Sequence, residues 1–192
     1  LLIVSFLFQS SFSQTYQTPP FLKTNWDWVD SVYTSLTQKE RIAQLIMIPA
    51  WSNKGAAHEK EVEYLVTKYK IGGIAFFQGG PGRQIELINR YQAISDLPLL
   101  MGTDAEWGLG MRLDSTMSFP YQMALGAIQN DSLIYAMGRE IGRQLRLTGM
   151  QMNFAPVLDV NNNPENPVIN YRSFGSDKYN VSRKGIAYMQ GL

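Results

Sequence analysis

Residues 71–104 read IGGIAFFQGGPGRQIELINRYQAISDLPLLMGTD, and they contain one complete strand–helix–strand unit. Residues 74–77 form an apolar run without polar alternation, which is typical of a strand covered on both faces. A glycine-rich loop, residues 78–82, leads into an amphipathic helix over residues 83–95. A second apolar run follows at residues 97–104. Since both strands are buried and the connection between them is long, they are expected to be parallel neighbours.

The same alternation continues on both sides of this unit. Thr37 and Glu40 have the spacing of a capping box, which predicts a helix that merges into a short buried strand ending near residue 50. Gly149 lies where a C-cap glycine belongs. Strand and helix alternate four times, with crossovers of roughly 20 or more residues, as in right-handed βαβ units. The other expected elements are helices over residues 59–69 and 131–148, a strand over 150–160 and a helix from 177 to the last residue.

Two architectures agree with this alternation, a doubly wound open sheet and a (β/α)8 barrel. A whole barrel needs about 250 residues, and four units fill about half of one. The sequence therefore predicts an α/β fold, namely the first half of a (β/α)8 TIM-type barrel with about four βα units, truncated. A half-barrel leaves its first and fourth strands as open edges. We therefore expect the isolated 192 residues to be inactive and prone to aggregation.

The N-terminal residues carry an export pattern. Residues 1–8 are apolar except for Ser5, and Ser11-Phe12-Ser13 has the small-x-small pattern of a signal-peptide cleavage site. An apolar run this short cannot cross a bilayer, which needs about 20 residues, so no membrane span is expected in the mature chain. We expect a secreted or periplasmic protein, and a buried N-terminal strand is the alternative. The expected segments are a secretory signal remnant at residues 1–13, a lead-in at 14–27 and a barrel domain at 28–192.

Composition excludes several classes of function. The 17 Lys and Arg against 16 Asp and Glu leave no basic excess, so no nucleic-acid partner is expected. The absence of cysteine removes disulfides, thiolate nucleophiles and a lipid-attachment site. His58 is the single histidine, too few for a histidine-rich metal site, and it is expected at the surface or in a loop. No metal or cofactor is predicted, and any catalysis must use carboxylates.

The third strand ends in a group of polar residues, at the edge where parallel α/β folds bind ligands. Asp104 and Glu106, with Trp107 beside them and Arg112 shortly after, lie two positions apart on a segment expected to be extended, so that they point the same way. They suit sugar binding, because carboxylates accept and arginine donates hydrogen bonds to hydroxyls. They also suit the acid and nucleophile of a retaining glycosidase, or loop-capping ion pairs with Arg112. The preceding loop, residues 78–82, lacks phosphate-cradle spacing and is interpreted as a tight turn.

The fourth strand and its loop supply the other candidates. Asp159 lies near the strand end, and Arg172 stands between aromatic residues. A guanidinium held by its neighbours is preorganised to donate hydrogen bonds to a ligand. The alternative is a structural ion pair of Arg172 with Asp159 or Asp177.

Six ordered motifs carry a family resemblance. Between residues 28 and 192 the chain resembles glycoside hydrolase family 3, N-terminal domain, of the bacterial β-N-acetylglucosaminidase type. The match includes the Asp104-Ala105-Glu106-Trp107-Gly108 run and the Tyr171-Arg172-Ser173-Phe174-Gly175 run. The motifs lie at residues 35–47, 72–77, 104–112, 119–126, 153–160 and 166–175.

The resemblance implies a barrel that hydrolyses terminal β-linked N-acetylglucosamine with retention, through a covalent glycosyl-aspartate, on peptidoglycan or chitin fragments. Asp104, Arg112 and Arg172 match positions that hold the sugar in the −1 subsite. Glu106, Trp107 and Asp159 are possible supporting residues; the family commonly has Gly at the position of Trp107, and its Arg often comes sooner than Arg112.

In the family, the nucleophilic Asp, a Lys-His pair and the acid/base His follow the Arg-Ser-Phe-Gly motif. No residue of this chain is therefore predicted to be catalytic, and neither Asp104 nor Glu106 is expected to be the nucleophile. A further C-terminal domain is possible.

Three other functions stay open. A β-glucosidase of the same family tends to carry an Arg-Trp-Gly-Arg run, whereas residues 171–175 favour the hexosaminidase branch. A catalytically silent protein that binds carbohydrate or cell wall would share every feature of this chain. An unrelated barrel enzyme such as an aldolase would need a Schiff-base lysine at a strand end, and the predicted strand ends supply none.

Overall fold

The computed structural model describes residues 26–192, which divide between Leu36 and Thr37 into two compact units. The expected signal remnant at residues 1–13, and residues 14–25 of the expected lead-in, lie outside the described residues. The described part of the first unit contains the helix α1 (Asp27–Ser35). No helix within residues 26–192 combines the length and the hydropathy needed to span a bilayer.

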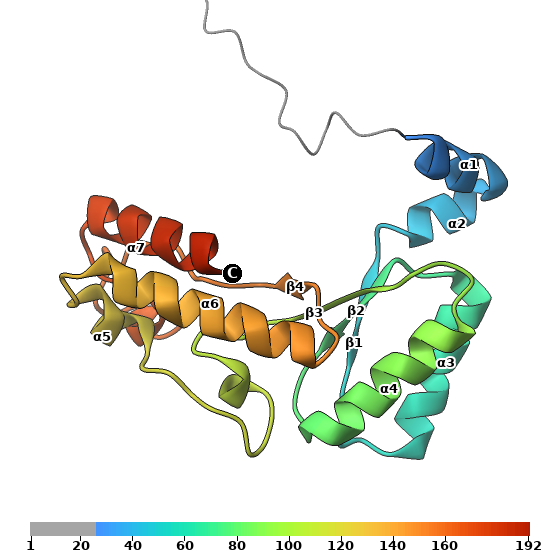
Figure 1. Ribbon diagram of the computed structural model, residues 1–192, viewed down its shortest axis with the longest axis horizontal. Coiled ribbons are helices and arrows are strands. Elements are labelled where there is room, and N and C mark those ends of the chain that lie inside the picture. Colours follow the sequence, from blue (N-terminus) through green and yellow to red (C-terminus); the bar gives the residue numbers. More distant parts are fainter. Residues whose placement is uncertain (1–25) are drawn as a thin grey trace, which may run out of the picture. The chain divides into compact units, whose positions relative to one another are not determined.

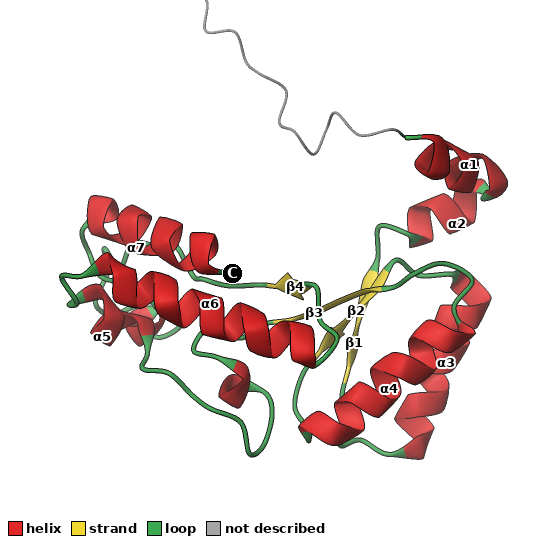
Figure 2. Ribbon diagram, in the orientation of Figure 1, coloured by secondary structure: helices red, strands yellow, loops and turns green. Residues whose placement is uncertain are grey.

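The second unit is built on a parallel sheet of four strands in the order β1-β2-β3-β4. Its strand order equals its chain order, and a helical connection links each strand to the next (Figure 2). The predicted succession of parallel βα units is confirmed, with β1 and β4 as the outer strands of the sheet. The strands are β1 (Met47–Ala50), β2 (Gly73–Phe76), β3 (Leu100–Thr103) and β4 (Met152–Asn153).

Two helices begin at residues whose side chains suit the first turn of a helix. The predicted capping box is formed, since the Glu40 carboxylate accepts the Thr37 N–H at 2.8 Å and the Thr37 hydroxyl accepts the Glu40 N–H at 3.4 Å. The helix after β2 begins at Pro81 rather than Arg83, because proline loses no hydrogen bond in the first turn of a helix. The helices are α2 (Gln38–Ala43), α3 (Ala56–Tyr69), α4 (Pro81–Ile94), α5 (Gln122–Gly126), α6 (Asp131–Leu147) and α7 (Lys178–Gly191), with 3-10 turns η2 (Leu109–Met111) and η3 (Asn170–Arg172).

The fourth strand is much shorter than predicted. It ends at Asn153, whereas the apolar pattern indicated residues 150–160. Its partner β3 ends at Thr103, whose carbonyl accepts the Phe154 N–H at 2.8 Å, and Pro156 has no N–H to continue a ladder. The remaining residues therefore run as an irregular segment beyond the carboxyl end of the sheet.

The third strand also begins later than predicted, at Leu100 rather than residue 97. Pro98 carries no N–H, and the Leu99 N–H donates to the Gln92 side chain at 3.0 Å instead of to a neighbouring strand.

The helices pack in two pairs, α3 with α4 and α6 with α7 (Figure 1). The α6–α7 pair is close, since a Cβ on Gly138 would collide with the Tyr188 carbonyl. Lys184 of α7 is fully buried there, and its ammonium donates to the Asp131 carboxylate and the Ile128 carbonyl. A single core runs through the unit, and its largest fully buried apolar side chains are Ile74, Phe76, Leu87, Tyr91, Met101, Ile134, Ile141, Met150, Phe174 and Tyr188.

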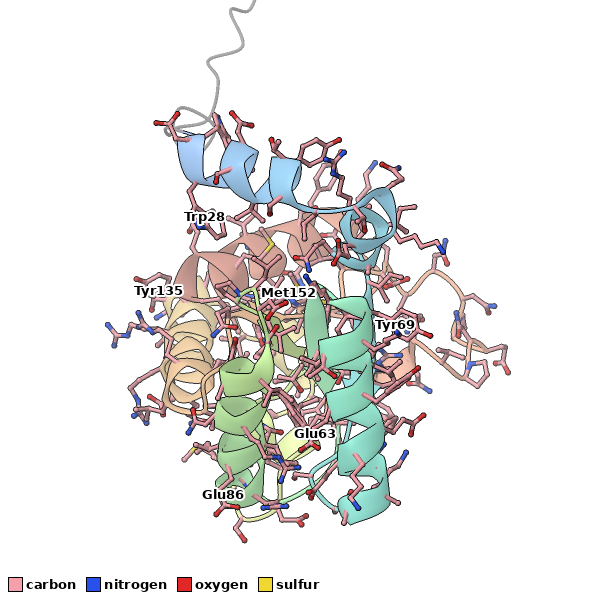
Figure 3. The ribbon with its side chains drawn as sticks, turned by 90° about the vertical axis from the view of Figure 1, so that its right-hand side faces the viewer. Trp28, Glu63, Tyr69, Glu86, Tyr135 and Met152 are labelled. Atoms are coloured by element: carbon pink, nitrogen blue, oxygen red, sulfur yellow. The ribbon has the colours of Figure 1, made fainter. Side chains whose placement is uncertain are left out.

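The α3–α4 pair is joined by an ion-pair cluster on the face that Figure 3 turns to the viewer, where Glu63 and Glu86 are labelled. The buried Glu59 carboxylate of α3 accepts from Arg83 Nη2 at 2.6 Å and from Arg90 Nη2 at 2.8 Å. Arg90 Nε also lies 2.8 Å from Glu63 Oε1. These hydrogen bonds from Arg83 and Arg90 hold the pKa of Glu59 below its ordinary 4.5.

Replacing Glu59 with glutamine is expected to lower the free energy of unfolding by about 1–2 kcal/mol at pH 7, because charge-assisted hydrogen bonds from two arginines are weakened. The pKa of Glu59 is lower in the folded state, so its contribution is present above the unfolded value of 4.5 and is lost as the pH falls through the folded value. Thermal unfolding of the parent protein and the variant, followed by circular dichroism from pH 7 to pH 3, measures this as a Tm difference that shrinks in acid.

The matched control for this prediction is Glu86→Gln, since Glu86 also binds Arg83 but its side chain is 67% exposed. We expect that variant to keep the parental Tm within error, as is usual for exposed pairs. An equal loss in both variants, or a Tm difference for Glu59→Gln that does not change with pH, would contradict the prediction.

Candidate functional site

Side chains that directly follow the strands gather at the carboxyl edge of the sheet. Trp51 follows β1 and Phe77 follows β2, and their rings stack with centroids 5.2 Å apart. The Lys54 ammonium lies 3.2 Å from the Trp51 ring centroid, and the Arg112 guanidinium lies 4.8 Å from that of Phe77. Sequence reasoning missed this aromatic pair, although the position of each ring immediately after a buried strand was a usable signal.

Asp104 follows β3 and binds Arg112. Arg112 Nε donates to Asp104 Oδ1 at 2.6 Å, and its Nη2 donates to Oδ2, which makes a two-point contact. The 3-10 turn η2 returns the chain from one partner to the other. The Gly79 N–H donates to the Arg112 carbonyl at 3.2 Å, so the loop after β2 holds the arginine in place.

That loop is the tight turn that the sequence indicated, and α4 begins directly after its Gly80. Gly79 has φ of +153°, and a Cβ there would collide with the Ser52 hydroxyl. A glycine is therefore needed where the loops after β1 and β2 approach each other.

Glu106 binds Arg172, and this is a correction to the expected partners of that arginine. The Glu106 side chain is only 2% exposed and accepts from Arg172 Nη2 at 2.7 Å and from Arg172 Nε at 3.0 Å. Neither Asp159 nor Asp177 forms this bond. The sequence could not indicate it, because the two partners come from different loops, one after β3 and one after β4.

The two carboxylates therefore do not act as one pair. The expectation that Asp104 and Glu106 point the same way on an extended segment is wrong, because the chain turns at Glu106 and the Gly108 N–H donates to the Ala105 carbonyl at 3.1 Å. The alternative that both bind Arg112 holds for Asp104 alone. Each carboxylate orients its own arginine.

The turn between Asp104 and Glu106 is held by hydrogen bonds to both backbone groups of Ala105. The Asn153 carboxamide of β4 accepts the Ala105 N–H at 2.9 Å, and the Tyr188 hydroxyl of α7 donates to the Ala105 carbonyl at 3.1 Å. Asn153 Nδ2 also donates to the Tyr188 hydroxyl at 3.3 Å. Burial raises the pKa of Tyr188, so the phenol stays protonated and remains a donor.

Negative charge surrounds Arg172. Its hydrogen bonds with Glu106, followed by the weaker fields of Asp159 and Asp104, raise its pKa above the ordinary value of an arginine against the opposing effect of burial. Asp159 has an exposed side chain, and its carbonyl accepts from the Ser173 hydroxyl at 2.5 Å. Asp159 thus supports the Arg172 loop through its backbone and its charge rather than through an ion pair.

Trp107 lies at the rim of this site, half-buried, with its ring edge-on to Tyr121 at a centroid distance of 4.7 Å. His58 lies on α3 rather than in a loop, where its Nε2 accepts the Trp51 N–H at 3.3 Å. It lies within the aromatic group after β1 as a half-buried side chain.

The arrangement has the donors and acceptors that a polyhydroxy ligand requires. Arg112 and Arg172 are held by carboxylates that follow β3, and the partly exposed Asp104 carboxylate retains lone pairs beyond its arginine. Among residues 26–192 there is no group of three or more His, Asp or Glu placed to hold a metal ion.

Comparisons with known proteins relate this geometry to one family. The model of the glycosyl hydrolase family 3 N terminal domain matches residues 37–192. Beta-hexosaminidase A of Pseudoalteromonas piscicida is 34% identical over 145 residues, which are 69% of this chain and 24% of that protein.

Solved structures agree with the family match. A glycoside hydrolase family 3 beta-N-acetylglucosaminidase from Paenibacillus sp. str. FPU-7 has a TM-score of 0.74 and 36% identity, covering 82% of this chain and 31% of the other. Beta-glucoside phosphorylase BglX bound to 2FGlc has a TM-score of 0.78 and 26% identity, covering 85% of this chain and 29% of the other. The chain thus spans about a third or less of the length of these proteins.

Proposed function

The chain belongs to glycosyl hydrolase family 3 through its N-terminal domain, and from this premise we propose that the protein containing it removes terminal β-linked N-acetylglucosamine with retention. The observation that carries the proposal is the two-point Glu106–Arg172 contact beside the Asp104–Arg112 pair, at the edge of the sheet where barrel enzymes bind their substrates. Peptidoglycan or chitin fragments are the proposed source of the sugar.

Each site residue has a proposed role in holding the terminal sugar. Asp104 accepts hydrogen bonds from sugar hydroxyls, and Arg112 and Arg172 donate to hydroxyl oxygens. The buried Glu106 orients Arg172, and Asp159 secures the Arg172 loop. Trp107 offers an apolar ring beside the sugar. The nucleophile and the acid/base are proposed to lie beyond the Arg172 motif, as the family resemblance implies.

A second candidate is action on β-glucosides. It is favoured by the similarity of the fold to the beta-glucoside phosphorylase, at 26% identity and a TM-score of 0.78. A catalytically silent carbohydrate-binding or cell-wall-binding protein is the third candidate, since a binder would need the same arginine–carboxylate pairs.

The test is to determine the coding region past Leu192, to express the complete protein and to assay chromogenic β-N-acetylglucosaminide and β-glucoside side by side. Each substrate is offered with and without inorganic phosphate. Hydrolysis of the acetamido sugar in preference to the glucoside supports the proposal. Preference for the glucoside would move the assignment to the second candidate, and product formation from the acetamido sugar only with phosphate would contradict hydrolysis. Absence of turnover, with retained binding of cell-wall sugar, would move it to the silent binder.

Export is also proposed, so that the protein is secreted or periplasmic. The mature chain is expected to begin near Gln14, because signal peptidase cleaves after small-x-small patterns such as Ser11-Phe12-Ser13. N-terminal sequencing of protein recovered outside the cytoplasm measures this. Replacing Ser13 with tyrosine should block cleavage, whereas Phe12→Leu, between the two small residues, should leave it unchanged. Recovery of an uncleaved cytoplasmic protein would refute the proposal.

A further inference from the structure

An exposed aromatic surface adjoins the arginine–carboxylate site. It consists of Trp107, Tyr121 and Tyr171, which we call the aromatic wall. The Trp107 and Tyr121 centroids lie 4.7 Å apart, and the Tyr121 and Tyr171 centroids lie 4.6 Å apart with an interplanar angle of 44°. Tyr121 is 47% exposed and Tyr171 is 48% exposed, so both rings have solvent-facing area that no other described side chain covers.

The wall is held by buried polar contacts underneath it. Tyr121 directly precedes α5, and the next residue, Gln122, is fully buried. With its amide oriented so that both neighbours are satisfied, the Gln122 carboxamide donates to the Arg172 carbonyl and accepts the Val157 N–H at 3.1 Å. Because Tyr171 directly precedes Arg172, this one side chain fixes the backbone beside both tyrosines.

A second tie comes from the loop after β3. The Phe119 N–H donates to the Trp107 carbonyl at 2.8 Å. This backbone hydrogen bond joins the segment that leads to Tyr121 to the residue that carries the tryptophan ring. The three rings therefore come from separate parts of the chain and are kept in contact by backbone hydrogen bonds and a buried amide. Rings held this way lose little freedom when a ligand packs on them.

The wall and the proposed sugar site are carried by the same two loops. Trp107 directly follows Glu106 in the chain and Tyr171 directly precedes Arg172, and the Glu106–Arg172 contact joins the two loops at these residues. The three rings present apolar faces, and the two phenol groups can donate and accept hydrogen bonds. This is the chemistry that fits the C–H face and the hydroxyl rim of a neutral pyranose.

We propose that the aromatic wall binds the second sugar ring of a β-linked oligosaccharide, next to the terminal sugar held by Asp104, Arg112 and Arg172. The proposal rests on the proposed function to the extent that a terminal sugar occupies those residues. It makes the preferred ligand a neutral oligosaccharide rather than a single sugar with a small leaving group.

Binding tests this without relying on turnover. The probes are N-acetylglucosamine and its thio-linked disaccharide, whose sulfur bridge resists hydrolysis, titrated calorimetrically into the complete protein. The disaccharide is expected to bind at least about tenfold more tightly than the monosaccharide, a step of about 1.4 kcal/mol. Tyr121→Ala and Tyr171→Ala are each expected to reduce this affinity ratio at least about fivefold, and Tyr121→Phe and Tyr171→Phe should largely retain it.

The chain offers a matched control in Tyr69→Ala. Tyr64 and Tyr69 of α3 form another exposed ring pair, with centroids 5.9 Å apart. Because this pair is not part of the aromatic wall, Tyr69→Ala should leave the affinity ratio unchanged. A disaccharide that binds no more tightly than the monosaccharide, failure of both sugars to bind, or a ratio insensitive to the tyrosine-to-alanine changes would overturn the proposal.

Activity is measured separately on chromogenic β-N-acetylglucosaminide. An inactive protein with an intact affinity ratio would contradict the proposed hydrolysis alone. An active protein without the ratio would contradict the aromatic wall alone.

Discussion

Replacing Arg172 with alanine is expected to lower kcat/KM of the complete protein on a β-N-acetylglucosaminide by at least about 100-fold, equal to about 2.7 kcal/mol of transition-state stabilisation. It is also expected to lower the free energy of unfolding by about 3 kcal/mol. The first effect follows from loss of the guanidinium that we propose donates to sugar hydroxyls. The second follows because the Glu106 side chain, 2% exposed, loses its charged partner.

The two effects are separable by a double-mutant cycle in denaturant unfolding. Removing Glu106 together with Arg172 should cost less stability than the sum of the single changes, because the second deletion removes the carboxylate that the first one left without its partner. Activity should not recover in the double variant, since the proposed donor to the sugar is absent in both.

Arg143→Ala is the matched control for Arg172→Ala. Arg143 also makes a two-point contact with a glutamate, Glu140, at 2.7 and 2.8 Å, but on the outside of α6, where its side chain is 55% exposed. An exposed pair of this kind contributes about 0–1 kcal/mol, so both activity and stability should stay near parental values. Equal behaviour of the two arginine variants would contradict the assignment of Arg172 to the site.

Replacing Lys184 with alanine is expected to lower the free energy of unfolding by about 3 kcal/mol, because its fully buried side chain leaves a cavity and the half-buried Asp131 carboxylate keeps only Arg183 as a partner. The lysine is fully buried and donates to the Asp131 carboxylate and the Ile128 carbonyl, which joins α7 to the start of α6. Its hydrogen bond is the main reason that the pKa of Asp131 is held below its ordinary value. The loss is measured by urea unfolding of the complete protein at pH 7.

The loss should extend to the site, since Tyr188 lies one turn further along α7 and donates to Ala105 between the two site carboxylates. Affinity for N-acetylglucosamine is therefore expected to fall in Lys184→Ala even at a temperature where the variant remains folded.

Two variants bracket this prediction. Lys184→Met keeps most of the buried volume and should cost less than Lys184→Ala, although the Ile128 carbonyl still loses its donor. Lys178→Ala removes an exposed lysine from the first turn of the same helix and should have little effect. A cost below about 1 kcal/mol for Lys184→Ala would show that the buried pair does not hold the two helices together.

The sequence was sufficient to predict those structural features that depend only on residues close together in the chain. The Thr37–Glu40 capping box, the apolar run at residues 74–77 and the glycine after α6 were all predictable, because their hydrogen bonds and dihedral angles are decided within a few residues. The parallel order of the four strands followed from long crossovers between buried runs. The candidate residues Asp104 and Arg172 could likewise be found as polar residues that follow strands.

The sequence by itself determined the βα succession, the edge of the sheet where polar side chains collect, and the family. Only the tertiary structure decided which carboxylate binds which arginine, that β4 ends at Asn153, and that Tyr121 meets Tyr171. The physical reason is distance along the chain: Glu106 and Arg172 are 66 residues apart, and Ala105 and Tyr188 are 83 apart. Such contacts form only once parallel strands bring their carboxyl ends together, and no periodicity in the sequence encodes that pairing.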